Sequence, residues 1–271
     1  MSDISSLFRR SVSLAVIAGL CWSCDSKDPA PGGKLKIEFD NVVGDKNLVL
    51  NGVSYENATG EDFVITKFNY FVSNFRLYKT DGTVFTVPQD SCYFLIKEDN
   101  RTSQLITLKN LPTGDYDHVE FMVGVDSLRN TMPQERRTGA LDPGGDMAGD
   151  GMYWAWNSGY IFVKLEGSSS FGNPTNNKFY YHIGLYGGYD KPTVNNTRIV
   201  KIKFGNDIAR VTESHTPEVH LFADVLKFFD GPATHLSIAE YPGIMAADVH
   251  RPYTQKIADN YKQMFSYDHI H

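Results

Sequence analysis

Hydrophobic and polar positions alternate along most of the chain after residue 34, and this period of two is typical of β-strands. In the segment 35–39, three apolar side chains alternate with two charged ones, which predicts a strand with one buried and one solvated face. Asp81-Gly82 separates the apolar segments 63–78 and 84–87; this dipeptide favours a type I′ turn, so we expect a hairpin. Further strands are predicted at 93–97, 104–108, 118–125, 153–166, 179–185, 198–204 and 218–222.

Helical patterns are scarce. Segment 223–229 could form two turns, and after Pro252 four apolar residues, the last of them Met264 and Phe265, recur at helical spacing, which predicts one amphipathic helix. Segment 128–151 has no periodicity and contains two prolines and five glycines, so we expect a long loop. The pattern as a whole predicts an all-β protein, an antiparallel β-sandwich with long loops and a short C-terminal helix.

Composition and charge exclude several classes of protein. The 271 residues are 41% hydrophobic and 21% charged, which is enough apolar material for a large core. Lys and Arg total 26 against 32 Asp and Glu, a net charge of -6. Nucleic-acid binding is not expected, because neutralising phosphates needs a clustered basic face. No apolar stretch reaches the ~20 residues that a membrane-spanning helix needs.

The N-terminal segment has the pattern of an export signal. Two arginines precede a short apolar run at 12–20, and small residues and cysteine follow it. Ser23 gives Cys24 the small preceding residue that a bacterial lipoprotein signal peptidase favours, which predicts lipidation of Cys24. The alternative is plain secretion, with Cys24 an ordinary thiol.

The predicted processing divides the chain into three parts. Residues 1–23 are the lipoprotein signal peptide, residues 24–33 are a tether rich in Pro, Gly and charge, and 34–271 form a single domain. We therefore expect an exported outer-membrane or periplasmic lipoprotein that contacts the membrane only through its lipid anchor. Cys92 then has no partner for a disulfide and is predicted to be a small buried strand residue.

The most informative segment is 141–167, which contains two tryptophans and a methionine at alternate positions. In an extended strand Met152, Trp154 and Trp156 share one face. From residue type alone, such a row favours core packing or an aromatic lid over a ligand-binding surface.

Four separate motifs together resemble a known family. They are the segments 124–130 (GVDSLRN), 139–143 (GALDP), 152–160 (MYWAWNSGY) and 181–184 (YHIG). In order and spacing they resemble the MbnP-like copper-binding family, in its Bacteroidetes-type lipoprotein branch. The resemblance covers essentially the whole mature domain, with a weaker match at 258–265.

The resemblance implies a periplasmic or surface β-sandwich that binds copper and is not itself an enzyme. In some relatives, a di-haem peroxidase of the MauG type oxidises a tryptophan to kynurenine. Intact tryptophan has no lone pair for a metal, whereas ring opening leaves an aniline nitrogen. By motif position, the metal ligands are His182, together with Trp154 or Trp156 after oxidation. Asp126 is expected to orient the imidazole, and Asn157 to lie beside the ligands.

One position departs from the family pattern. Thr131 follows Asn130 where the methanotroph-type branch has a histidine, so one ligand is missing if that histidine binds the metal. Met132, Met147 or Met152 could replace it, since thioethers suit Cu(I).

The remaining histidines are weaker candidates. His269 and His271 form an H-x-H pair that could hold copper or zinc if ordered, although chain ends usually fray. His215 and His220 flank a turn. The three others, His118, His235 and His250, are interpreted as structural.

Two further functions stay open. The alternative to copper binding is a metal-free cell-surface module that binds a glycan or protein partner through its aromatic strand and long loop. A hydrolase is the weaker possibility, because the chain has no G-x-S-x-G or H-E-x-x-H motif.

Overall fold

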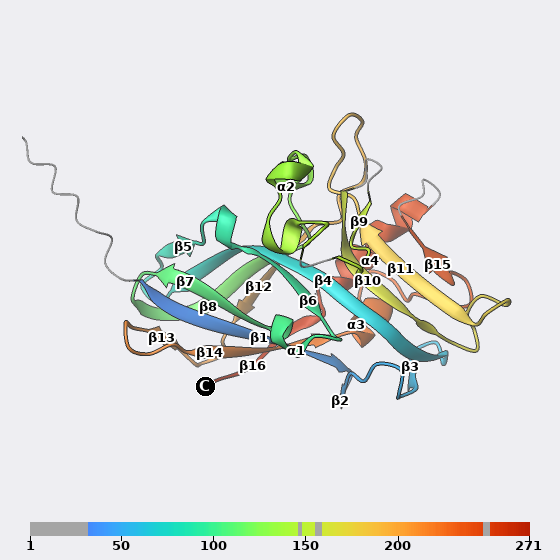
Figure 1. Ribbon diagram of the computed structural model, residues 1–271. Helices are drawn as coiled ribbons and strands as arrows, with labels where there is room; N and C mark the ends of the chain where they lie inside the picture. The colour runs from blue at the N-terminus through green and yellow to red at the C-terminus, as the bar shows by residue number, and fades with distance from the viewer. Residues whose placement is uncertain (1–31, 146–147, 155–158, 246–249) are drawn as a thin grey trace, which may run out of the picture. The chain divides into compact units, whose positions relative to one another are not determined.

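We describe a computed structural model of the chain (Figure 1). The described residues are 32–145, 148–154, 159–245 and 250–271. The predicted signal peptide, Cys24, Met147, Trp156 and Asn157 lie outside them. No helix in the described part of the chain is long and apolar enough to cross a membrane.

The domain contains two β-sheets. The larger sheet has the spatial order β12 (Arg198–Lys203), β8 (Gly114–Val123), β4 (Asp62–Lys79), β10 (Gly159–Ser168), β11 (Lys178–Gly184) and β15 (Gly243–Ile244). Shorter strands extend it: β13 (Ala209–Val211) pairs with β8, β9 (Tyr153–Trp154) pairs with β10, and β3 (Tyr55–Glu56), β5 (Val84–Thr86) and β6 (Tyr93–Lys97) pair with β4. The smaller sheet consists of β16 (Phe265–Ile270), β14 (Glu218–Asp224), β1 (Gly33–Val43) and β2 (Lys46–Asn47), with β7 (Leu105–Leu111) also on β1.

The main hydrophobic core lies between the two sheets. Phe39 of β1 meets Phe121 of β8 edge to face, with ring centroids 5.6 Å apart. Both rings are fully buried, and edge-to-face contact suits the charge distribution of aromatic rings. The predicted all-β sandwich is therefore confirmed, although β1 pairs with β14, and β11 with β15, in parallel.

Helices are few and short. They are α1 (Arg101–Gln104), α2 (Ser127–Asn130), α3 (Leu226–Phe229) and α4 (Arg251–Tyr261), with single 3-10 turns η1 (Gln89–Ser91), η2 (Gln134–Arg136) and η3 (Gly139–Leu141). The segment predicted as a long loop thus contains three helical turns. The C-terminal helix is confirmed but ends at Tyr261, because Phe265 already pairs with Ala223 as the first residue of β16.

Two local predictions can be compared directly with the structure. Strands β4 and β5 form the expected hairpin, but of Asp81 and Gly82 only Gly82 has a positive φ, of 86°. A type I′ turn needs positive φ at both positions, so that detail was wrong. Cys92 is fully buried, as predicted, but it immediately precedes β6 and is not in a strand; burial raises the pKa of its thiol.

A second hydrophobic cluster covers the opposite face of the larger sheet. Phe71 and Phe162 belong to it, whereas their neighbours Val72 and Val163 point into the main core. The segment between β8 and β10 folds over this face and contributes Met152 to the cluster. The sequence motifs therefore converge on the face of the sheet that turns away from the main core.

Candidate metal centre

The indole of Trp154 packs directly on a glycine of the H-x-G motif. Trp154 pairs with Gly159 across β9 and β10, and 8% of its surface is exposed. A Cβ added to Gly184 would lie 2.9 Å from Cζ3 of the indole and 2.5 Å from the Tyr160 carbonyl oxygen. The ring and the backbone occupy the space a side chain would need, so this position requires glycine.

His182 lies on the same face of β11 as Gly184. Tyr181 and Ile183 point into the main core, and successive side chains of a strand point to opposite faces. The imidazole is therefore on the outer face, two residues from the glycine on which the indole of Trp154 packs. Trp154 of β9 thus packs against β11 two residues from His182.

A carboxylate holds the imidazole of His182. Nε2 of His182 donates to Oε1 of Glu166 on the neighbouring strand β10, at 2.7 Å. The ammonium group of Lys164 lies 3.4 Å from the same oxygen. The hydrogen bond from His182, opposed by burial and aided by the charge of Lys164, lowers the pKa of Glu166 to about 2. Glu166 is thus ionised and fixes which ring nitrogen of His182 carries the proton.

A hollow of about 450 Å³ opens beside His182. Glu166, Tyr180 and Met245 line it with the histidine. Met245 also packs against the second hydrophobic cluster, the one that contains Trp154. A histidine and a methionine therefore line the same hollow, whose lining does not include Trp154.

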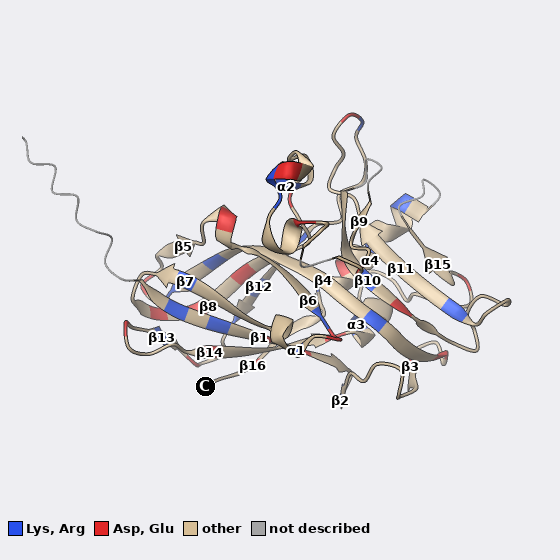
Figure 2. Ribbon diagram, in the orientation of Figure 1, with Lys and Arg blue, Asp and Glu red and all other residues tan. Residues whose placement is uncertain are grey.

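Ion pairs fasten the segment before Trp154 to the sheet. Asp150 lies 3.1 Å from the ammonium of Lys67 on β4 and 3.2 Å from that of Lys97 on β6. Lys164 on β10 donates to the Asp150 carbonyl oxygen at 2.8 Å. Figure 2 shows basic residues in blue on β4 and near the end of β6. This network positions β9 and its tryptophan.

Asn130 ties the first motif to the aromatic hairpin. Its side-chain amide donates to the Val125 carbonyl at 2.6 Å, and its oxygen accepts the Tyr160 N–H at 3.0 Å. The side chain is buried, and a Cβ on Gly159 would come within 2.1 Å of its Oδ1. The motifs at 124–130 and 152–160 are thus in direct contact.

Asp126 does not contact His182, so its predicted role was wrong. One oxygen accepts the Arg129 N–H as the cap of α2, and the other accepts from Tyr93 and Asn74. The side chain is fully engaged at the start of α2. Glu166 makes the contact that was expected of Asp126.

The methionines and Thr131 have different surroundings. Met152 is 1% exposed within the second cluster. Met132 lies 3.5 Å from the guanidinium of Arg129 and lines another hollow. The Thr131 hydroxyl donates to the Ser127 carbonyl at 2.8 Å. Neither Met132 nor Thr131 is placed beside His182.

Sequence reasoning missed two residues of this site. Glu166 could be placed on a solvated strand face, but strand alternation does not reveal that β11 is its neighbour. Met245 has no sequence signal, because it reaches the hollow from a short segment after β15.

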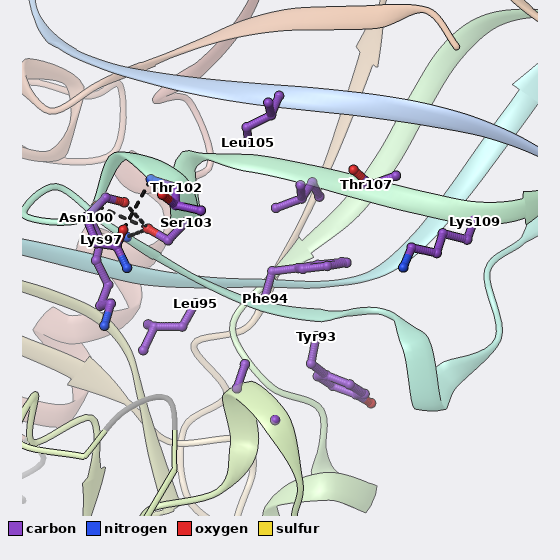
Figure 3. A pocket seen from close by; sticks show the side chains of 13 residues that line it. Tyr93, Phe94, Leu95, Lys97, Asn100, Thr102, Ser103, Leu105, Thr107 and Lys109 are labelled. Atoms are coloured by element: carbon purple, nitrogen blue, oxygen red, sulfur yellow. Dashed lines mark hydrogen bonds between the residues drawn. The ribbon is translucent and has the colours of Figure 1, made fainter. Parts of the chain in front are cut away.

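Another hollow, of about 580 Å³, lies elsewhere, between β6, α1, β7 and η3. Figure 3 shows Tyr93, Phe94 and Leu95 along it, with Asn100 and Ser103 at one end, where the Ser103 hydroxyl donates to the Asn100 backbone carbonyl. Its lining includes neither His182 nor Trp154. It therefore does not extend the candidate metal centre.

Comparisons with known proteins agree with the motifs. The family model for MbnP matches residues 32–246. The fold is similar to that of MbnP from Methylosinus trichosporium, with a TM-score of 0.52, 17% sequence identity, and coverage of 80% of this chain and 81% of that chain. A search of curated proteins found no match.

Proposed function

Because the chain belongs to the MbnP family, we propose that it is an exported copper-binding protein and not an enzyme. The observation that carries this proposal is the position of His182. The Glu166 carboxylate holds its imidazole at 2.7 Å, at a hollow that Met245 also lines. A histidine whose second nitrogen is bound by a carboxylate is the usual arrangement around protein-bound metals.

The side chains at the hollow fit a soft copper ion. When Nε2 of His182 donates to Glu166, Nδ1 keeps the lone pair that a metal needs. The Met245 thioether favours Cu(I) over harder cations. Thr131 adds no ligand, because its hydroxyl donates to backbone carbonyls. We therefore expect His182 and Met245 to hold copper, with a further ligand needed for tight binding.

Trp154 supplies that ligand in this proposal. An intact indole offers only an N–H donor, so the ring must first be opened: two equivalents of peroxide add two oxygen atoms to give N-formylkynurenine and two waters, and hydrolysis then releases formate and leaves kynurenine. We propose a di-haem peroxidase of the MauG type as the oxidising partner. Mass spectrometry of the peptide 152–164 from the native organism should show this change at Trp154. Intact tryptophan at 154 in native material would remove it as a ligand.

Competition against a Cu(I) chelator tests the site itself. His182→Ala should weaken Cu(I) binding by at least about a hundredfold. Glu166→Gln should weaken it by about tenfold to a hundredfold, as is typical for the partner of a metal-bound histidine. His235→Ala is the matched control, since that imidazole is exposed and pairs with Asp230. Equal affinity in wild type and His182→Ala would contradict the proposal and favour the metal-free binding module.

Export and lipid anchoring are part of the proposal. Its support is the arginine pair, the apolar run at 12–20 and Ser23 before Cys24. Protein made in a bacterial host should partition into detergent, and Cys24→Ala should release it, since each buried CH₂ of an acyl chain contributes ~0.8 kcal/mol. If wild type and Cys24→Ala stayed in the soluble fraction to the same extent, the lipid anchor would be excluded.

A further inference from the structure

The outer face of the smaller sheet carries a second group of metal-ligating side chains. Strands β14 and β16 are antiparallel, with a register shift between Val219 and Leu221. Tyr267 and Ile270 of β16 both pack against the main core, although strict alternation would put residues three apart on opposite faces. A β-bulge at the register shift explains why Tyr267 and Ile270 can share one face. The two residues between them, Asp268 and His269, both point outward.

His220 of β14 faces these residues with one ring nitrogen unused. Its Nε2 lies 2.8 Å from Oε2 of Glu38 on the parallel neighbour β1. Its Nδ1 is buried, has no hydrogen-bond partner, and lies 3.4 Å from Oδ2 of Asp268. A buried polar atom without a partner is costly. A carboxylate on one nitrogen leaves the lone pair of the other free for a metal.

Two further imidazoles complete the group. The rings of His220 and His269 have centroids 4.8 Å apart, and those of His269 and His271 4.3 Å. The Nε2 atoms of His269 and His271 lie 2.8 Å apart. The backbone of His271 exchanges two hydrogen bonds with Glu218, of 2.9 and 3.2 Å. The H-x-H pair is therefore held against β14.

We propose that His220, His269 and His271, with Asp268, bind one divalent transition-metal ion, Cu(II) or Zn(II). Ligand atoms of His220, Asp268 and His269 lie within 4.8 Å of one another. A tetrahedral ion with bonds of about 2.0–2.1 Å needs ligand atoms roughly 3.3 Å apart. To reach this spacing the more exposed side chains of His269 and His271 must rotate, and His269 must release its contact with Asp268, while Glu38 holds His220.

The chemistry of this group separates it from the copper site proposed above. It has imidazole and carboxylate ligands and no thioether, a set that suits divalent ions rather than Cu(I). It also lies on the smaller sheet, whereas His182 lies on the larger one. Each site can therefore be removed without the other.

The test is titration of the full chain with Zn(II) and with Cu(II) against a chromophoric chelator. Wild type and His182→Ala should both bind one equivalent of Zn(II) at the histidine group. His220→Gln and His271→Gln should each lower that affinity at least about a hundredfold, and Glu38→Gln about tenfold to a hundredfold. The control His215→Gln changes an exposed histidine in the loop before β14 and should have no effect.

Spectroscopy identifies the ligands independently of affinity. Co(II) added to wild type should give the intense visible absorption of a tetrahedral site, and Cu(II) should show hyperfine coupling to imidazole nitrogen in electron paramagnetic resonance. Both signals should be lost in His271→Gln, whose exposed side chain can change without disturbing the core. Wild-type affinity in His220→Gln and His271→Gln, or loss only in His182→Ala, would overturn the proposal.

Discussion

The indole of Trp154 rests on the backbone of Gly184, where even a methyl group would come within 2.9 Å of the ring. His182 precedes this glycine by two residues on the same face of β11. The glycine thus leaves room for an aromatic ring of one motif at a position two residues along the strand from the histidine of another. In the H-x-G motif, sterics therefore require the glycine, whereas the histidine is the candidate metal ligand.

Gly184→Ala should destabilise the protein by about 2 kcal/mol, because overpacking a filled site typically costs 1–3 kcal/mol. It should also displace Trp154 and so weaken copper binding to the oxidised protein. Urea unfolding followed by tryptophan fluorescence measures the first effect. Gly144→Ala is the control, since its new methyl would meet Asp142 at an ordinary 3.5 Å. Equal urea midpoints of unfolding for Gly184→Ala and Gly144→Ala would show that the space around Gly184 is not filled as described.

Asn130→Ala should cost about 1–3 kcal/mol, because it leaves the buried Tyr160 N–H without its acceptor. The free energy of unfolding in urea measures this loss. Asn195→Ala is a matched control, because that side chain is exposed and caps only a local turn to Thr197. A cost below that of the control would mean that the two motifs are not joined through Asn130.

Glu61 should make stability depend on acid pH. It accepts hydrogen bonds from the backbone N–H groups of Ile238 and Ala239 and from the side chains of Asn57 and Ser237. Although burial opposes ionisation, these bonds lower the pKa of Glu61 from 4.5 to about 2. Its contribution, about 3 kcal/mol, is present above pH 4.5 and is lost as pH falls towards 2.

The free energy of unfolding, measured at several pH values, checks the direction of this pH dependence. Glu61→Gln should be less stable than wild type at pH 7, and the difference should shrink as pH falls from 4.5 to 2.5. Glu213→Gln, in an exposed loop, should show no such trend. A constant difference for Glu61→Gln at all pH values would contradict the assignment.

Thr131→His should leave Cu(I) binding within about twofold of wild type, although the resemblance places a histidine after Asn130. The Thr131 side chain lies on the backbone of α2 and not in the hollow beside His182. Chelator competition on the oxidised protein measures the change. Thr197→His, on the exposed turn after Asn195, is the control. A gain of tenfold or more over that control would contradict this prediction and mean that the side chain at position 131 reaches the copper.

The sequence by itself determined most of the strands and their faces, although the predicted strand 153–166 was wrong and forms two paired antiparallel strands, β9 and β10. The predicted strand 93–97 coincides with β6, and the buried positions of β1 follow the alternation read at 35–39. These features depend on local spacing, since each side chain of a strand points away from its neighbour. The four motifs likewise identified the family from residues read in order.

Only the tertiary structure decided which strands are neighbours and therefore which side chains meet. Glu166 and His182 come from strands that pair in space, and alternation carries no information on pairing partners or direction. The outward turn of His269 depends on a bulge that forms only when β16 pairs with β14. The contacts of both candidate metal sites cross between strands, so their geometry is set by long-range packing that no local pattern records.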